Sequence, residues 1–302
     1  MKASVLHEYG PASNLKYEEF PDPKPGPGEV LVRVQAVSLN PIDWKLRSGA
    51  AKAIFPLTFP AILGRDVAGT VRELGEGVKD FAVGDRVFAL ANRTYAELCI
   101  VKSSELARIP DKLDMTTAAA VPLVALTGDQ LIRKATKVQA GQTILLTGAL
   151  GSVGRCALFA ALEIGAHVIA GVRKQQIHDA MDLGAIAAID INDDVSIASL
   201  GTLDAVADTV GGASATKLID KVKPGGIFGT VLGPPSNAAL HPTVTVNHIM
   251  ATPDPTTVVH YAEAVRDGKL KLPIDRILPL SQAAEAQTVA EKGGIGKVIL
   301  TP

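Results

Sequence analysis

Apolar and polar residues alternate along several short segments in the first third of the chain. The segments KASVLHE, EVLVRVQAVSL, VAGTVREL and YAELCIV show the two-residue period of a strand with one buried face. Turn-forming stretches separate them, including PDPKPGPG at residues 21–28 and GEGVKDFAVGD at residues 75–85. The pattern predicts a small antiparallel barrel or sandwich in this part of the chain.

From about residue 122 the pattern changes to short apolar runs that alternate with helical patterns. Six such runs are strand candidates, which is typical of a doubly wound parallel sheet. After residue 251 come a helical segment, a strand-like segment, a second helix and a closing GKVIL strand. We therefore predict an α/β fold with a β-rich domain formed by residues 1–122 and 252–302, and a parallel six-stranded domain formed by residues 123–251. The strand candidates are TILLT, AHVIAG, AIAAID, LDAVADTV, GGIFGTV and TVTVNHI, and helices are expected from residue 152, over 174–183 and over 213–222.

Composition and charge narrow the classes of partner. With 302 residues, of which 47% are apolar, the chain can bury a core in each of two domains. The formal net charge of -1 provides no global field for nucleic acid or an anionic membrane, and no apolar run approaches the roughly 20 residues of a membrane-spanning helix. The two cysteines exclude a disulfide framework and a four-thiolate zinc site. We expect a cytoplasmic protein that binds small molecules, not nucleic acid or a membrane.

Glycines follow the run ILLT at the point where the predicted strand gives way to a helix. In GALGSVG the spacing is that of a dinucleotide-binding loop, where glycine lets the backbone approach a pyrophosphate and lets the helix pack closely on the sheet. The N–H groups and positive dipole end of the helix favour phosphate there. A bare glycine-rich turn is the alternative, but the strand–helix context favours cofactor binding. The residues predicted to contact the cofactor in this loop are Gly148, Ala149, Gly151, Ser152, Val153 and Gly154.

The next strand indicates which dinucleotide binds. NAD sites usually carry a carboxylate at the end of this strand to accept the ribose hydroxyls, but AHVIAGVRKQQIH contains no acid. Arg173 and Lys174 come at that point instead, and a guanidinium can donate paired hydrogen bonds to a 2′-phosphate. NADPH is therefore the predicted cofactor, with a solvated basic helix start as the alternative. The carboxyl ends of later parallel strands also meet ligands in such folds, which adds Val210, Gly211, Leu232 and Gly233 to the predicted cofactor site.

Seven segments carry a wider resemblance when they are taken in order. They are SLNPIDWKLRSG (38–49), PAILGRDVAGTVRELGEGVKDFAVGDRV (60–87), TYAEL (94–98), AAAVPLVALTG (118–128), GALGSVG (148–154), VGG (210–212) and GKVIL (296–300). Together they resemble the medium-chain dehydrogenase/reductase superfamily, in particular its zinc-independent quinone oxidoreductase branch. The resemblance implies a GroES-like catalytic domain and a Rossmann cofactor-binding domain. It also implies a homodimer, commonly formed through edge strands of the cofactor domains, for which TVTVNHI is the candidate.

The first two segments depart from the zinc-dependent members of this superfamily. Those members carry a cysteine three residues before an aspartate in the first segment, and Gly-His-Glu in the second. Here Asn40 stands three residues before Asp43, and the second segment reads Gly64, Arg65, Asp66, so the thiolate and imidazole ligands are absent and we predict no metal. Without a Lewis acid the substrate must already be activated, as quinones and α,β-unsaturated carbonyls are, because hydride addition gives them a delocalised anion. The resemblance thus implies NADPH-dependent reduction of a quinone or enone, and the alternative is a non-catalytic NADPH-binding redox sensor or interaction protein.

Three residues of SLNPIDWKLRSG are the candidates for catalysis. The resemblance places the Asn40 amide where it donates to a substrate oxygen or contacts the nicotinamide ribose, with Asp43 beside it, and a turn after a strand is the alternative. Lys45 is a candidate to stabilise an enolate or to donate a proton, and a solvated surface lysine is the alternative. Thr127 matches a family position near the nicotinamide, and a threonine that bonds back into its own helix is the alternative. Lys297 is assigned a structural role. The proton donor stays unassigned.

Overall fold

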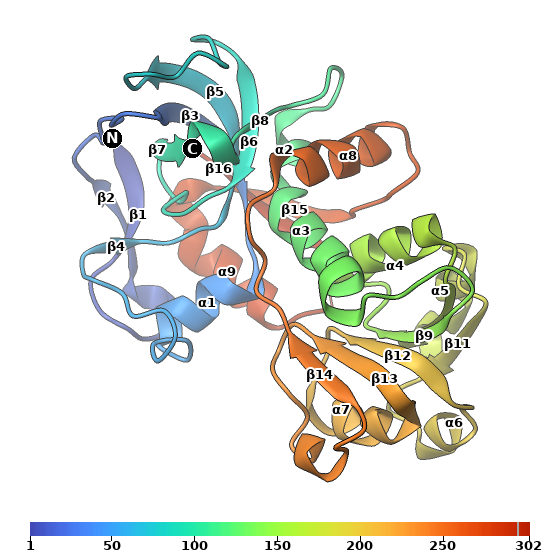
Figure 1. Ribbon diagram of the computed structural model, residues 1–302. Helices are drawn as coiled ribbons and strands as arrows, with labels where there is room; N and C mark the ends of the chain where they lie inside the picture. Colours follow the sequence, from blue (N-terminus) through green and yellow to red (C-terminus); the bar gives the residue numbers. More distant parts are fainter. Residues whose placement is uncertain (295) are drawn as a thin grey trace. The chain divides into compact units, whose positions relative to one another are not determined.

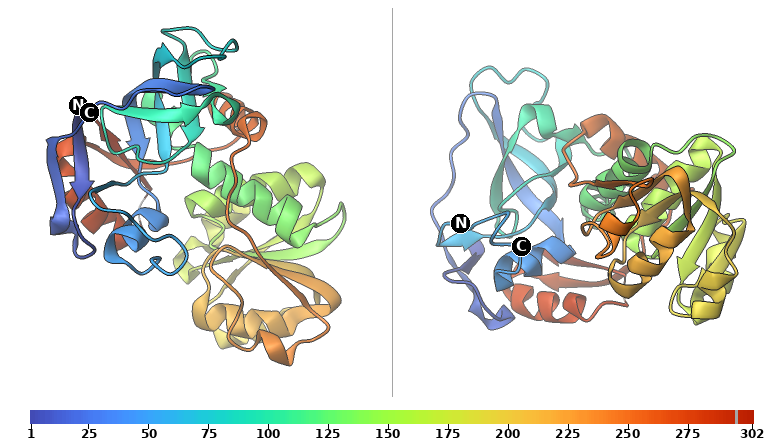
Figure 2. Two further views of the ribbon diagram at one scale, coloured as in Figure 1. Left: turned by 60° about the vertical axis from the view of Figure 1, so that its left-hand side comes forward. Right: turned by 60° about the horizontal axis from the view of Figure 1, so that its bottom comes forward.

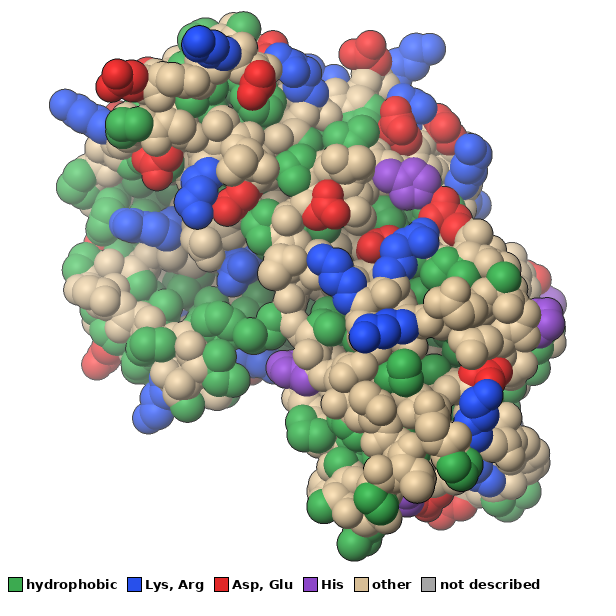
Figure 3. Space-filling model, in the orientation of Figure 1, with side chains coloured by type: hydrophobic (Ala, Val, Ile, Leu, Met, Phe, Trp, Pro, Cys, Tyr) green, Lys and Arg blue, Asp and Glu red, His purple; other side chains and the backbone are tan. Residues whose placement is uncertain are grey.

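The computed structural model describes residues 1–294 and 296–302, and the chain divides into two compact units (Figure 1). Unit 1 comprises Met1–Leu123 and Thr252–Pro302, and unit 2 comprises Val124–Ala251. Charged side chains of both signs are interspersed over the face in Figure 3, in keeping with the formal net charge of -1. Across the described residues, we find no helix with the length and apolar character needed to cross a membrane.

Unit 2 is built on a six-stranded parallel sheet with the strand order β11-β10-β9-β12-β13-β14. Its central strand buries Ile144, Leu145 and Leu146 completely, because helices cover both faces of the sheet (Figures 1 and 2). The helices α6 and α7 pack on one face, over a core that includes Val206 and Phe228, and α3, α4 and α5 lie on the other. The strands are β9 (Thr143–Thr147), β10 (His167–Val172), β11 (Ala187–Asp190), β12 (Leu203–Asp208), β13 (Val222–Thr230) and β14 (Thr245–His248), and the helices are α3 (Pro122–Gln130), the π-helix η3 (Leu131–Thr136), α4 (Ser152–Ile164), α5 (Ile177–Asp182), α6 (Asp194–Ala198) and α7 (Gly212–Leu218).

This sheet confirms the predicted doubly wound fold, with differences at the helix boundaries. The helix expected over residues 174–183 begins with a 3-10 turn, η4 (Lys174–Gln176), before α5. The helix expected over residues 213–222 ends in a second 3-10 turn, η5 (Ile219–Lys221), because Val222 already pairs with Leu203 in the sheet. The sequence pattern also missed α6, a helix that Asp193 caps by accepting a hydrogen bond from the Ser196 N–H.

Unit 1 is centred on β3 (Glu29–Ser38), which alternates buried valines with exposed Arg33 and Gln35. This strand pairs antiparallel with β5, β7 and β16, within a sheet of order β15-β16-β3-β5-β6-β8. A second, three-stranded sheet has the order β2-β1-β4. The remaining elements of unit 1 are β1 (Lys2–Leu6), β2 (Leu15–Glu19), β4 (Ala61–Ile62), β5 (Asp66–Leu74), β6 (Arg86–Leu90), β7 (Leu98–Lys102), β8 (Ala107–Arg108), β15 (Ile274–Pro279), β16 (Lys297–Thr301), α1 (Pro41–Ser48), α2 (Met115–Ala119), α8 (Pro255–Arg266) and α9 (Ala283–Glu291).

The segment after β3 forms the helix α1, and not the turn that is the alternative from the sequence. Asn40 is its N-cap in an extended conformation, Pro41 occupies the first helical position, and the Asp43 Oδ2 accepts a hydrogen bond from the Asn40 N–H at 2.9 Å. Gly49 ends the helix with a φ of 81°, a left-handed conformation that glycine adopts without strain. The three candidate catalytic residues therefore lie at the N-cap or within the first five positions of the same helix.

Candidate functional site

The segment from Gly148 to Gly154 comprises the loop that joins β9 to α4 and the first turn of α4, and it is shaped by close backbone approaches. A Cβ on Gly154 would lie 2.0 Å from the Gly148 carbonyl oxygen, so only glycine fits there. Gly148 has a φ of 64°, and a Cβ on it would lie 2.5 Å from the Thr209 Oγ1. Gly151 is the N-cap of α4 and has no side chain to cap the helix, so the N–H groups of the first turn are left for an external acceptor.

A buried aspartate fixes the neighbouring strand ends. Asp208, at the carboxyl end of β12, is fully buried and accepts hydrogen bonds from the Thr147 Oγ1 at 2.8 Å and the Thr230 Oγ1 at 3.1 Å. It also accepts from the N–H groups of Val210 at 3.2 Å and Gly211 at 3.0 Å. One carboxylate thus ties the ends of β9, β12 and β13 to the loop after β12. Asp208 was not predicted from the sequence, although an acid that closes the apolar run LDAVAD was a usable signal.

Beside these strand ends lies a cavity of about 610 Å³ within unit 2. Gly211, Leu232 and Gly233, three of the predicted cofactor residues, line it, and Val210 next to them is 46% exposed. The structure therefore brings the ends of β12 and β13 together around one hollow. Its lining is formed by Gly211, Gly212, Ala213, Ala215, Thr216, Lys217, Leu232, Gly233, Pro234, Pro235 and Ser236.

The two predicted cations follow directly after β10. Arg173 and Lys174 are both exposed, and the Arg173 guanidinium has no hydrogen-bond or ion-pair partner among the described residues. Lys174 lies closer to an acid: hydrogen bonds from Ser196 and the charge of Lys174 lower the pKa of Asp193. Of the two, the planar Arg173 guanidinium, with its paired donors, is the better match to a phosphate.

The other predicted cofactor residues are positioned by α3 and α4. Thr127 is half-buried on α3, Ser152 and Val153 are half-buried in the first turn of α4, and Ala149 is fully buried in the loop before it. The two helices approach closely, because a Cβ on Gly128 would lie 2.6 Å from the Ala157 backbone nitrogen.

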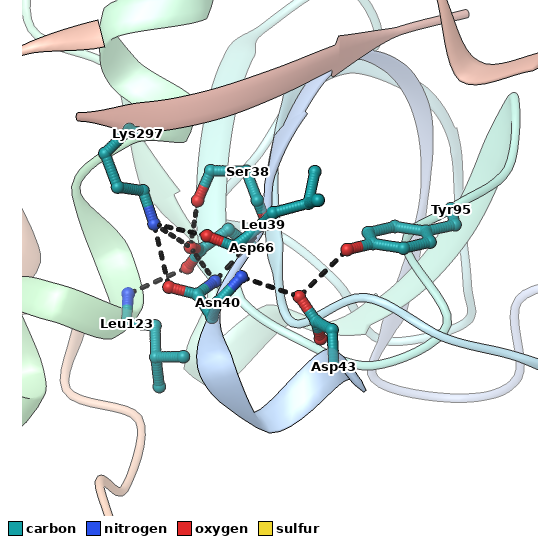
Figure 4. Close-up of polar contacts among 8 residues, drawn as sticks. All are labelled: Ser38, Leu39, Asn40, Asp43, Asp66, Tyr95, Leu123 and Lys297. Carbon is teal, nitrogen blue, oxygen red and sulfur yellow. Dashed lines mark hydrogen bonds and ion pairs between the residues drawn. The ribbon is translucent and has the colours of Figure 1, made fainter. Parts of the chain in front are cut away.

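In unit 1, Asn40 belongs to a buried polar cluster (Figure 4). Its Nδ2 donates to the Asp66 Oδ2 at 2.7 Å and to the Ser38 carbonyl oxygen at 3.3 Å, and its Oδ1 accepts from the Lys297 Nζ at 2.8 Å. Asp66 also accepts from the Ser38 Oγ at 2.5 Å and from the Leu123 N–H at 2.7 Å. Both donor hydrogens of the Asn40 amide are therefore engaged within the protein, and its contact with a substrate stays a prediction.

Asp43 forms a second polar group at the start of α1. The Tyr95 hydroxyl donates to the Asp43 Oδ2 at 2.9 Å, and both side chains are fully buried (Figure 4). The Asp43 Oδ1 has no hydrogen-bond partner among the described residues. Burial raises the pKa of Asp43 to about 7, against the opposing hydrogen bonds from Asn40 and Tyr95. Burial and the neighbouring Asp43 raise the pKa of Tyr95 well above its usual value.

Lys45 is half-buried on α1, and its ammonium has no hydrogen-bond or ion-pair partner among the described residues. The next turn carries Arg47, which is 4% exposed and joins α1 to α9. Its guanidinium donates to the Gln287 Oε1 at 2.8 Å, the Glu291 Oε2 at 3.0 Å and the Gly10 carbonyl oxygen at 3.2 Å. Arg47 thus anchors the helix that carries the candidate catalytic residues.

The donor set around Asn40 does not resemble a metal site. Arg65 directs its Nε to the Ala91 carbonyl oxygen at 3.1 Å, and Asp66 is engaged in the cluster described above. Throughout the part of the chain that the structure describes, we find no group of three or more His, Cys, Asp or Glu side chains that could hold a metal ion. A cation is nevertheless present in the cluster, and it is the ammonium of Lys297.

Comparison with known proteins shows which families this chain matches. Residues 26–111 match the alcohol dehydrogenase GroES-like domain, and residues 183–300 match the zinc-binding dehydrogenase family. The quinone oxidoreductase of Pseudomonas aeruginosa is 31% identical over 97% of each chain. The chloroplastic NADPH-dependent alkenal/one oxidoreductase of Arabidopsis thaliana is 31% identical, over 100% of this chain and 80% of that protein.

Among solved structures, the quinone oxidoreductase from Coxiella burnetii superposes with a TM-score of 0.91 at 29% identity, over 100% of this chain and 99% of that one. These matches span both units and confirm the resemblance inferred from the sequence motifs. The chain belongs to the medium-chain dehydrogenase/reductase superfamily, in its quinone oxidoreductase branch.

Proposed function

We propose that this protein is an NADPH-dependent oxidoreductase that reduces quinones or α,β-unsaturated carbonyls by hydride transfer. The observation that carries the proposal is the segment from Gly148 to Gly154, in which Gly148 and Gly154 sit where a Cβ would clash and the start of α4 has no capping side chain. That segment follows the central strand of the parallel sheet, where the strand order reverses and doubly wound folds bind dinucleotides.

The residues of unit 2 fit such a cofactor. The N–H groups at the start of α4, around Ser152 and Val153, would hold the pyrophosphate, since they combine free donors with the positive end of the helix dipole. The cavity lined by Gly211 and Leu232 would take a further part of the dinucleotide, and Asp208 holds the loop that forms it. When bound, reduced nicotinamide supplies a hydride.

The preference for NADPH rests on Arg173. Its guanidinium is exposed and unpaired among the described residues, and residues 173–178, directly after β10, offer no carboxylate to accept ribose hydroxyls. A guanidinium matches phosphate oxygens in a bidentate manner, so a 2′-phosphate gains two charge-assisted hydrogen bonds that NADH cannot form.

The proposed substrate class is supported by the names of two relatives and by the polar side chains at the start of α1 in unit 1. Two relatives are named quinone oxidoreductase and alkenal/one oxidoreductase. The substrates in both names are carbonyl compounds conjugated to a double bond. Hydride addition to such substrates gives an anion that is delocalised, so the demands on the protein are positioning, exclusion of water and a few fixed donors or positive charges. Asn40, Asp43 and Lys45 are the candidate catalytic residues for this step.

The proposal is tested by following NADPH absorbance with a panel of ortho-quinones, para-quinones and 2-alkenals. We expect turnover with at least one class, and weaker turnover with NADH. The variant Arg173→Ala should weaken NADPH binding by about 10- to 100-fold and leave NADH binding unchanged, because it removes charge-assisted hydrogen bonds to the 2′-phosphate. Arg276→Ala, which removes an exposed arginine of unit 1, is the matched control.

Equal losses for both nucleotides would refute the 2′-phosphate assignment. Tight NADPH binding without turnover of any substrate would favour the non-catalytic alternative, a redox sensor or interaction protein.

We also propose a homodimer formed through β14. This strand ends the order of the parallel sheet, so one of its edges presents backbone groups without a partner strand among the residues that the structure describes. Light scattering coupled to size-exclusion chromatography should give twice the chain mass of 31.4 kDa, and a proline at Val246 should shift the result towards the monomer. A single-chain mass for the unaltered protein would contradict the proposal.

A further inference from the structure

Sheet register brings the end of the chain to the start of α1. In the antiparallel pair of β16 and β3, Ile299 is opposite Ser38, and the Leu39 N–H donates to the Val298 carbonyl oxygen at 2.9 Å. Continued by one step, the register places Lys297 against Asn40. Two residues that lie far apart in the sequence are therefore neighbours because of strand pairing.

The Lys297 ammonium sits in a cage of oxygen atoms (Figure 4). It donates to the Asn40 Oδ1 at 2.8 Å and to the Leu39 carbonyl oxygen at 3.0 Å, and it lies 3.8 Å from the Asp66 Oδ2. The Lys297 side chain is 4% exposed and that of Asp66 is 0% exposed. A primary ammonium suits this cage, since it is a compact cation with three donors.

The cation and the carboxylate together fix the Asn40 amide. The amide oxygen faces Lys297, and the amide nitrogen faces Asp66. A rotation of the amide by half a turn would set the nitrogen against the ammonium and the oxygen against the carboxylate, so both contacts would become repulsive. The arrangement therefore has one orientation, held from two sides.

A buried ion pair adds little net free energy to the stability of a fold. Desolvation opposes the attraction between the two charges, and apolar side chains of similar volume often serve stability equally well. A pair of this kind that also orients a candidate catalytic amide suggests a role in the site beyond folding.

We propose that Lys297 is the positioning residue of the unit 1 site: its ammonium is a cation supplied by the chain that locks the orientation of Asn40 and neutralises Asp66. This inference rests on the proposed function, and it replaces the purely structural role that the sequence suggested. It also assigns to the cage a chemical selectivity, for a primary ammonium group over bulkier or non-donating cations.

The test uses Lys297→Ala, which removes the side chain beyond Cβ, with propylammonium as the probe that restores the missing atoms. We expect kcat for the quinone to fall by about tenfold or more while KM changes by less than about threefold, because the group acts through an oriented amide and not on substrate binding alone. Propylammonium should restore kcat in a saturable manner, and tetramethylammonium, which has no N–H donor, should not. Lys271→Ala, the loss of an exposed lysine of unit 1, is the matched control.

A double variant separates positioning from charge balance. Lys297→Met with Asp66→Asn removes both buried charges, so the thermal midpoint reported by Trp44 fluorescence should recover relative to Lys297→Met alone, while kcat stays low. Recovery of both quantities would show that Lys297 only balances a charge, and the proposal would be overturned. Full turnover in Lys297→Ala without added amine would overturn it as well.

The result can be told apart from a failure of the proposed function. If no quinone or alkenal is turned over by the unaltered protein, the cage is still tested by the thermal midpoint of Lys297→Ala. A saturable rise with propylammonium and none with tetramethylammonium supports the ammonium site, and equal responses to both ions contradict it.

Discussion

The buried Asp43 carboxyl leads to a quantitative prediction about pH. Its pKa in the folded protein is about 7, raised chiefly by burial from the ordinary value of 3.8. The folded protein therefore binds this proton more tightly than the unfolded chain does, so the stabilising contribution is fully present below pH 3.8 and is lost as the pH rises through 7. The total is about 4 kcal/mol at about 1.4 kcal/mol per pKa unit, of which roughly 2 to 3 kcal/mol is lost between about pH 5 and pH 8.

The variant Asp43→Asn removes the titration and keeps an oxygen acceptor for the Asn40 N–H and the Tyr95 hydroxyl. Urea unfolding, followed by the fluorescence of Trp44, the one tryptophan of the chain, reports on unit 1. The free energy of unfolding of the variant minus that of the unaltered protein should increase by about 2 to 3 kcal/mol as the pH is raised from about 5 to about 8.

The control is Asp114, a carboxylate whose pKa is lowered in the folded protein. Burial would raise the pKa of Asp114, but hydrogen bonds from Thr116 and Thr117 hold it at about 2. Its protonation state is constant over this pH range, so Asp114→Asn should differ from the unaltered protein by the same free energy at both pH values. If the Asp43→Asn difference were equally independent of pH, the reasoning about this carboxyl would be wrong.

Three further substitutions follow from the contacts. Gly154→Ala would place a methyl group 2.0 Å from the Gly148 carbonyl oxygen, so fluorescence titration should show a loss of NADPH affinity of about tenfold or more, and unaltered affinity would contradict the close approach. Asp208→Ala removes the acceptor that ties three strand ends, so unit 2 should lose about 3 kcal/mol of stability. The amide groups of the loop after β12 should also exchange hydrogen faster, and exchange protection equal to that of the unaltered protein would refute this. Arg47→Met should lower the urea midpoint reported by Trp44 by the equivalent of about 2 to 4 kcal/mol, because it leaves the buried Gln287 Oε1 without its donor and breaks the link to Glu291. An unchanged midpoint would argue against that role.

Local patterns in the sequence predicted most of unit 2. The run TILLT is β9 residue for residue, and α4 begins at Ser152 as expected, because a buried strand and a glycine-rich loop both have short-range signatures. The helix α1 was harder, since NPIDWKLRS can be read as a turn. Asn40, Pro41 and Asp43 are residues typical of a helix start. The hydrogen bond from the Asn40 N–H to the Asp43 carboxylate, which shows that they cap a helix, can be seen only in the folded backbone.

The unit 1 site could be predicted only in part. Asn40 and Asp43 were found through a motif, whereas Lys297 and Asp66 reach Asn40 from paired strands and Tyr95 reaches Asp43 from a bend, all over long sequence separations. No periodicity along the chain encodes such register, so the partners of a candidate residue emerge only from the folded sheet.

A crystal structure of the protein grown with NADPH would test the proposed cofactor site. The pyrophosphate should lie against the backbone N–H groups at Ser152 and Val153, and the 2′-phosphate should lie within hydrogen-bond distance of the Arg173 guanidinium. A nucleotide bound elsewhere, or a 2′-phosphate turned towards solvent with Arg173 uninvolved, would refute the assignment of this site.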